Sequence, residues 1–124
     1  MAVMGTVEVR VRRVYETPGA DDGKRVLVDR LWPRGLSRQA AALDAWAKDV
    51  APSDGLRRRY GHDPERYADF VRDYRAELRE PECREAVERL RELAGGSRLT
   101  LLTATRDVAR SHVPVLLEAL REPS

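Results

Sequence analysis

Two short apolar runs, at residues 25–29 and 99–104, constrain the fold of this chain more than any other feature. Both lack the polar alternation of a strand that has one face in water, so we expect two β-strands that are buried on both faces. The long stretch between them has the residue spacing of helices. A connection of that kind joins parallel strands of one sheet as a crossover. The sequence therefore predicts an α/β fold, in which helices pack on a small, mostly parallel sheet.

A third strand is predicted at residues 7–15. There Val7, Val9 and Val11 alternate with charged residues, and a period of two is typical of a strand with one buried face. The next segment, residues 17–23, is rich in Pro, Gly and Asp and predicts a turn.

The other segments show helical spacing of apolar residues, with capping residues before them and Gly or Pro after them. Ser37 is expected to cap the first, and the spacing of Leu43, Trp46 and Val50 extends it as far as Pro52. The remaining helices are predicted at residues 56–60, 64–78, 81–94 and 113–120.

The composition fits one globular domain. A chain of 124 residues has the usual size of a domain, so we expect a single α/β domain over residues 1–124, with 1–5 and 122–124 loose. Hydrophobic residues make up 42% of the chain, which is enough for a core and argues against disorder. With one cysteine and no apolar run near the ~20 residues of a membrane span, we expect a cytoplasmic protein with no membrane partner.

Polar and aromatic residues follow each of the two buried strands. In a parallel sheet, ligands bind beyond the carboxyl ends of the strands, where the loops leave the layer. If the two strands are parallel, both loops lie at one edge of the sheet, and we expect a crevice that binds a small anionic or planar ligand. The predicted ligand-binding residues are Asp29, Arg30, Trp32, Arg34 and Arg106, and the predicted catalytic residues are Asp107 and His112.

Each group has an expected role. Arginine forks bind anions, and Asp29 is expected to orient one of the arginines by a charge-assisted pair. Asp107 and His112 are five residues apart, and the sequence predicts that they meet as an acid/base pair. The plainer alternatives stay open: Asp29 with Arg30 or Arg34 as a structural ion pair, Trp32 as a core plug, and the histidine as a hydrogen-bonding residue.

The sequence disfavours a metal site, because two histidines and one cysteine do not form a ligand cluster. No glycine-rich loop identifies a cofactor. Arginine supplies all but two of the 23 basic residues, against 21 acidic ones. One rival hypothesis is therefore a nucleic-acid-binding module that uses Arg10, Arg12 and residues 57–59, and another is a dimerising or scaffold protein.

Several motifs resemble the YeaO-like family of bacterial domains of unknown function. The longest is the segment 25–37, Arg-Val-Leu-Val-Asp-Arg-Leu-Trp-Pro-Arg-Gly-Leu-Ser, and it is followed by Trp46-Ala47-Lys48 and His62-Asp63-Pro64. Arg106-Asp107 and His112 continue the family's order, so the resemblance covers about residues 7–121. It implies a small cytoplasmic bacterial α/β domain and assigns no reaction.

Overall fold

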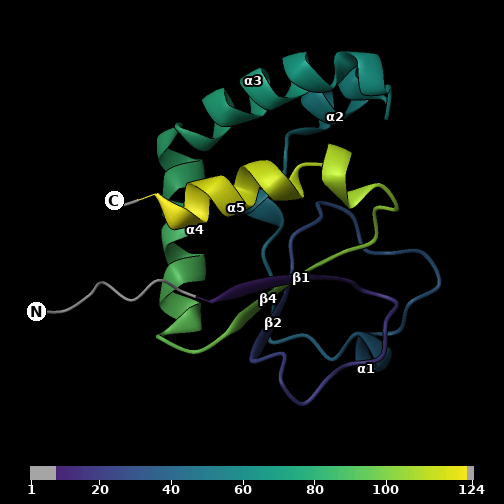
Figure 1. The fold of residues 1–124 in the computed structure, drawn as a ribbon, viewed down its shortest axis with the longest axis vertical. Coiled ribbons are helices and arrows are strands. Elements are labelled where there is room, and N and C mark those ends of the chain that lie inside the picture. The colour runs from purple at the N-terminus through teal and green to yellow at the C-terminus, as the bar shows by residue number, and fades with distance from the viewer. Residues whose placement is uncertain (1–7, 123–124) are drawn as a thin grey trace, which may run out of the picture.

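The strands of the computed structural model, which describes residues 8–122, form one parallel sheet (Figure 1). Their order across the sheet is β1-β4-β2-β3, and every neighbouring pair is parallel. The predicted α/β class is therefore confirmed. The strands are β1 (Val9–Arg13), β2 (Lys24–Leu27), β3 (Ala45–Trp46) and β4 (Leu99–Thr103).

Capping residues set the ends of the helices largely as expected. The side chains of Ser37 and Ser53 accept hydrogen bonds from the first turns of α1 and α2, and Gly61 and Gly95 end α2 and α4 in left-handed conformations. The α-helices are α1 (Arg38–Ala41), α2 (Asp54–Tyr60), α3 (Tyr67–Leu78), α4 (Pro81–Ala94) and α5 (Val113–Arg121). Three short 3-10 helices are η1 (Lys48–Val50), η2 (Pro64–Arg66) and η3 (Val108–Arg110).

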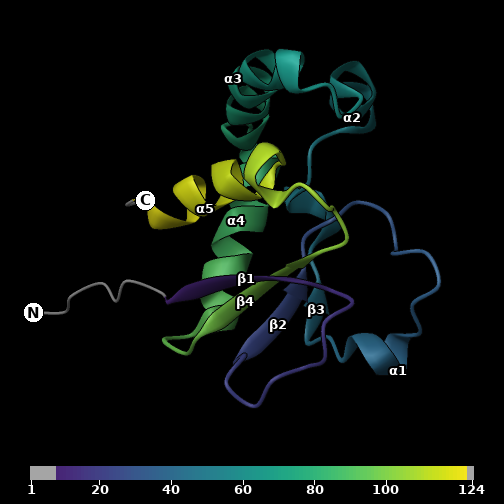
Figure 2. The same cartoon turned by 45° about the vertical axis from the view of Figure 1, so that its right-hand side comes forward.

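The two faces of the sheet are covered unequally. Val26 and Leu101 face the main core, which is built with the apolar residues of α2 to α5. Leu27 and Leu102 face a smaller cluster, to which α1 contributes Ala41. Figures 1 and 2 show α3, α4 and α5 on one side of the sheet and α1 on the other. The chain thus leaves β2 and β4 toward opposite faces.

The predicted helix over residues 43–50 is wrong. This segment forms β3 and η1 instead. Ala42 ends α1 in a left-handed conformation, and Trp46 then pairs with Leu27 of β2. Ala45 and Ala47 face the main core while Trp46 faces the smaller one. Successive side chains thus point to opposite faces of the sheet, as in a strand.

A buried ion pair fixes the loop between β1 and β2. Asp22 accepts hydrogen bonds from the guanidinium groups of Arg12 and Arg25 and from the backbone N–H of Gly19. The backbone carbonyl of Asp22 accepts a bond from the hydroxyl of Thr100 in β4. Because β4 lies between β1 and β2, this loop crosses the end of β4 and is tied to it.

The predictions for the chain ends fall partly outside the described range. Val7 and residues 1–5, 123 and 124 are not among the described residues. Glu122 is described, and its carbonyl accepts a hydrogen bond from Arg91 of α4. None of the helices within residues 8–122 combines the length and apolar character needed to cross a membrane.

Candidate functional site

A cavity of about 650 Å³ opens where the chain leaves β2 and β4. These strands are neighbours, and Leu27 pairs with Leu102 at their carboxyl ends. The loop after β2 runs to α1 on one face, and the loop after β4 runs to α5 on the other. Adjacent parallel strands whose connections part in this way leave a crevice between their loops, which is where ligands bind in open α/β sheets.

All the residues predicted from the sequence as site residues line this cavity. The loop after β2 contributes Asp29, Arg30, Trp32 and Arg34, and the segment after β4 contributes Arg106, Asp107 and His112. The contacts of these residues differ. Some of the side chains hold the loops in place, and others have no partner among the described residues and can contact a ligand.

Asp29 joins the two loops. Its carboxylate accepts hydrogen bonds from the hydroxyl of Thr103 at 2.7 Å and from the backbone N–H of Ala104 at 2.8 Å, and it lies 3.4 Å from Nε2 of His112. Burial by itself raises the pKa of Asp29, but the bonds from His112, Ala104 and Thr103 outweigh it and hold the pKa below its ordinary value. Asp29 is therefore an anion bound to the loop after β4, and the expected pairing with an arginine is wrong.

His112 lies at the start of α5, with its side chain 13% exposed. Its Nε2 is 3.1 Å from the backbone carbonyl of Val28, in addition to its contact with Asp29. The carboxylate of Asp107 instead lies 3.9 Å from Arg110 on the same short turn. Among the described residues the partner of His112 is thus Asp29, and the expected pair of Asp107 with His112 does not form.

Arg30 holds a backbone segment. Its Nε donates to the carbonyl of Pro52 at 2.9 Å, and its Nη2 donates to the carbonyl of Ala51 at 3.1 Å. These carbonyls come just before α2, and both residues are buried. Both backbone partners of this guanidinium are neutral and do not offset its positive charge. Arg30 therefore contributes positive potential to the cavity while it holds the segment before α2 in place.

Trp32 is partly a packing residue. Its indole N–H donates to the carbonyl of Leu36 at 2.7 Å, and its ring meets that of Trp46 edge to face at 5.4 Å. The guanidinium of Arg38 lies 4.8 Å from the centre of the Trp32 ring. Trp46 in turn donates to the backbone carbonyl of Asp29 at 2.7 Å, so the two tryptophans brace the loop after β2.

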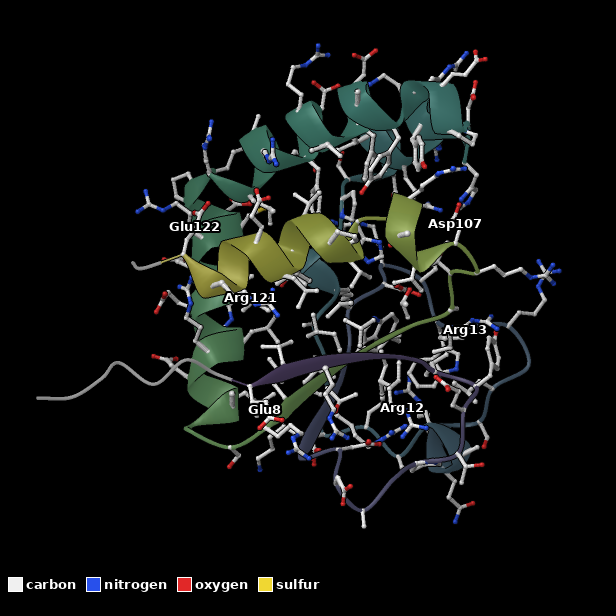
Figure 3. The ribbon with its side chains drawn as sticks, in the orientation of Figure 1. Glu8, Arg12, Arg13, Asp107, Arg121 and Glu122 are labelled. Atoms are coloured by element: carbon white, nitrogen blue, oxygen red, sulfur yellow. The ribbon has the colours of Figure 1, made fainter. Side chains whose placement is uncertain are left out.

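Of the arginines that line the cavity, Arg34 and Arg106 have the fewest contacts. Both are exposed, both line the cavity, and within residues 8–122 neither side chain makes a hydrogen bond or an ion pair. The backbones that carry them are held in place. The hydroxyl of Tyr15 donates to the carbonyl of Arg34, and Arg13 donates to the carbonyls of residues 104 and 105. Figure 3 shows Arg13 on the same side of the molecule as Asp107.

Sequence reasoning missed the apolar part of the cavity. Tyr15 and Leu31, 47% and 59% exposed, are its large exposed hydrophobic residues. Tyr60 and Phe70 stack at 4.6 Å, and both line the cavity. Tyr15 was detectable in principle, because the carboxyl end of a parallel β1 lies at the same edge of the sheet. The other lining residues not predicted are Pro33, Ala51, Pro52, Arg57, His62, Ala104 and Ser111.

Comparisons with known proteins identify the family. The family model described as "Inactive DUF488-N3 subclade" matches residues 8–124. The chain is 50% identical over 112 residues to the uncharacterised proteins Mb3100c of Mycobacterium bovis and Rv3073c of Mycobacterium tuberculosis, covering 90% of this chain and 92% of each relative. It is 38% identical over 115 residues to the uncharacterised protein YeaO of Escherichia coli, covering 93% of this chain and 98% of YeaO. No solved structure matches the chain. The resemblance seen in the sequence is thereby confirmed, and the chain belongs to the YeaO-like proteins of the inactive DUF488-N3 subclade.

Proposed function

We propose that the cavity binds a small organic anion that carries a flat ring. The observation that carries this proposal is the position of Arg34 and Arg106. They come from loops on either side of the crevice, line the same cavity and have no ion-pair partner within residues 8–122. Two free guanidinium forks beside one hollow favour a carboxylate or a phosphate between them.

The walls support a flat, apolar body for the same ligand. Tyr60 and Phe70 line the cavity, and Leu31 and Tyr15, which also line it, are exposed. Exposed apolar surface that gathers around a concave site is typical of ligand sites. A volume of about 650 Å³ also lies in the ordinary range for small-molecule pockets.

We propose that the cavity binds this anion without converting it to a product. The matching subclade is described as inactive. The proposed proton-handling residues, Asp107 and His112, make no contact with one another within the described chain, and the carboxylate that His112 meets is already bound by Thr103 and Ala104. We place this binding in the cytoplasm, which fits a chain with a single cysteine.

The nucleic-acid hypothesis has less support from the charges. Arg12 pairs with Asp22, and Arg57 and Arg59 also lie near carboxylates. Paired guanidiniums contribute little net potential toward a phosphate backbone. The scaffold hypothesis requires a broad apolar patch away from the crevice, whereas Tyr15 and Leu31, the large hydrophobic residues that the described chain exposes, both line it.

The test is an NMR titration with three probes of similar size: benzoate, which is flat and anionic, cyclohexanecarboxylate, which is anionic but not flat, and benzamide, which is flat but neutral. We expect benzoate to bind most tightly and to shift the signals of the cavity residues. Arg34→Ala and Arg106→Ala should each weaken benzoate at least about tenfold, the scale of a charge-assisted hydrogen bond. Arg84→Ala, on the exposed face of α4, is the matched control and should leave binding unchanged. Equal binding by all three probes, or no loss in the two cavity variants, would overturn the proposal.

A further inference from the structure

The second ring nitrogen of His112 is an unused polar atom at the cavity. The ring Nε2 faces two oxygen acceptors, the backbone carbonyl of Val28 at 3.1 Å and the carboxylate of Asp29 at 3.4 Å. Asp29 is ionised, because its hydrogen bonds hold its pKa below the ordinary value. Two acceptors at Nε2 require the ring hydrogen to be on that nitrogen. In the neutral ring, Nδ1 therefore carries the lone pair.

Nδ1 is also in contact with solvent. It has no hydrogen-bond partner among the described residues, yet every fully buried polar side-chain atom in that part of the chain does have one. Nδ1 is thus not fully buried. His112 lines the cavity while its side chain is only 13% exposed, which favours the cavity as the space that Nδ1 faces.

The neighbouring groups cannot take over this acceptor role. The carboxylate of Asp29 is already bound by the hydroxyl of Thr103, the N–H of Ala104 and the imidazole. Arg30, which lines the same cavity, is a donor only. A ligand group that meets the neutral ring of His112 at Nδ1 therefore meets an acceptor, whose orientation is set by the contacts of Nε2 with Asp29 and Val28.

We infer that His112 is a specificity-determining residue, and that the ligand presents an N–H or O–H donor to its Nδ1. This inference rests on the proposed function, the binding of a flat organic anion in the same cavity. It narrows the ligand to flat rings that combine an anionic group with a hydrogen-bond donor, such as a carboxylated or phosphorylated lactam heterocycle. A flat acid that carries only acceptors on its ring displaces the water at Nδ1 and offers that nitrogen no hydrogen-bond donor in return.

The experiment compares three flat monoanions. Orotate has ring N–H groups, 1,3-dimethylorotate has the same ring and charge without them, and benzoate has neither the N–H groups nor the added methyl bulk. We expect orotate to bind about three- to tenfold more tightly than either of the others, the range of one neutral hydrogen bond. If benzoate binds and orotate binds no better, the inference is overturned while the proposed function stands. If none of the three binds, both fail.

Two further measurements separate specificity from folding. His112→Gln keeps an N–H that can reach Asp29 and removes the imidazole Nδ1, so the ratio of the affinities for orotate and benzoate should fall to about one. Should that variant not fold, the tautomer of His112 in the natural protein can be read from its ring ¹⁵N chemical shifts. A hydrogen on Nδ1 in the free, neutral protein would contradict the inference directly.

Discussion

Nε2 of His112 lies 3.4 Å from the carboxylate of Asp29, and this contact joins the start of α5 to the end of β2. The two residues belong to loops that leave the sheet toward opposite faces. Their contact therefore ties the two loops together where both line the cavity. The inferred recognition of a donor group by His112 depends on this contact, because the inference assigns the ring hydrogen to Nε2.

Asp29→Ala should destabilise the fold by about 2–3 kcal/mol, because it leaves the N–H of Ala104 and the hydroxyl of Thr103 without their acceptor in a partly buried place. Urea unfolding measures the change. Asp107→Ala is the matched control, because Asp107 is exposed and makes only a loose ion pair, and its loss should stay within about 0.5 kcal/mol. Similar losses in both variants would contradict the structural role of Asp29.

The stabilisation by Asp29 should depend on pH. Its folded-state pKa lies below the ordinary value of 3.8, so its contribution is complete above that value and is lost as the pH falls through the folded-state pKa. The stability difference between the natural protein and Asp29→Asn should therefore narrow between about pH 6 and about pH 3. Chemical unfolding at both pH values checks this, and a difference that widens on acidification would be the wrong sign.

Replacing Arg30 by alanine should mainly lower the stability of the fold, whereas replacing Arg34 by alanine should mainly weaken anion binding. Arg30→Ala leaves the carbonyls of two buried residues without donors and should cost about 1–3 kcal/mol. Arg34→Ala removes an exposed side chain with no described partner and should change stability by no more than about 0.5 kcal/mol while it weakens anion binding. Thermal unfolding and benzoate titration of the two variants separate these effects. A large stability loss in Arg34→Ala would contradict the absence of a structural partner for its side chain within residues 8–122.

Two glycines with positive φ form a matched pair. A Cβ at Gly23, whose φ is +66°, would lie 2.2 Å from the carbonyl oxygen of Arg98, and that oxygen already accepts a hydrogen bond from the N–H of Lys24. Gly35 has a φ of +73°, and a Cβ there meets nothing within 4 Å. Gly35→Ala should cost about 1 kcal/mol for the backbone conformation alone, and Gly23→Ala about 3 kcal/mol or more, because it must also move a strand. Equal costs in denaturant unfolding would count against the close approach of the two backbones at Gly23.

Elements defined by a strong local pattern were predictable. The strand at Leu99–Thr103 is apolar and wholly buried, and the helix Pro81–Ala94 starts at a proline and ends at Gly95. The strand Ala45–Trp46 was not predictable, because two residues are too few to show a period. Its flanking apolar residues also happen to fit helical spacing. Its pairing with β2 depends on a neighbour that is distant in the sequence.

The sequence by itself determined that two buried parallel strands end in loops rich in arginine, aromatic and acidic residues, and hence where a site would lie. Only the tertiary structure decided how those residues pair. It joined His112 to Asp29 rather than to Asp107, which is nearer in the sequence, and bound Arg30 to backbone carbonyls. Among the described residues it gave the side chains of Arg34 and Arg106 no partner. The physical reason is that burial and periodicity are local properties of a chain. The partner of a polar group depends instead on which strands become neighbours and in what register they pair.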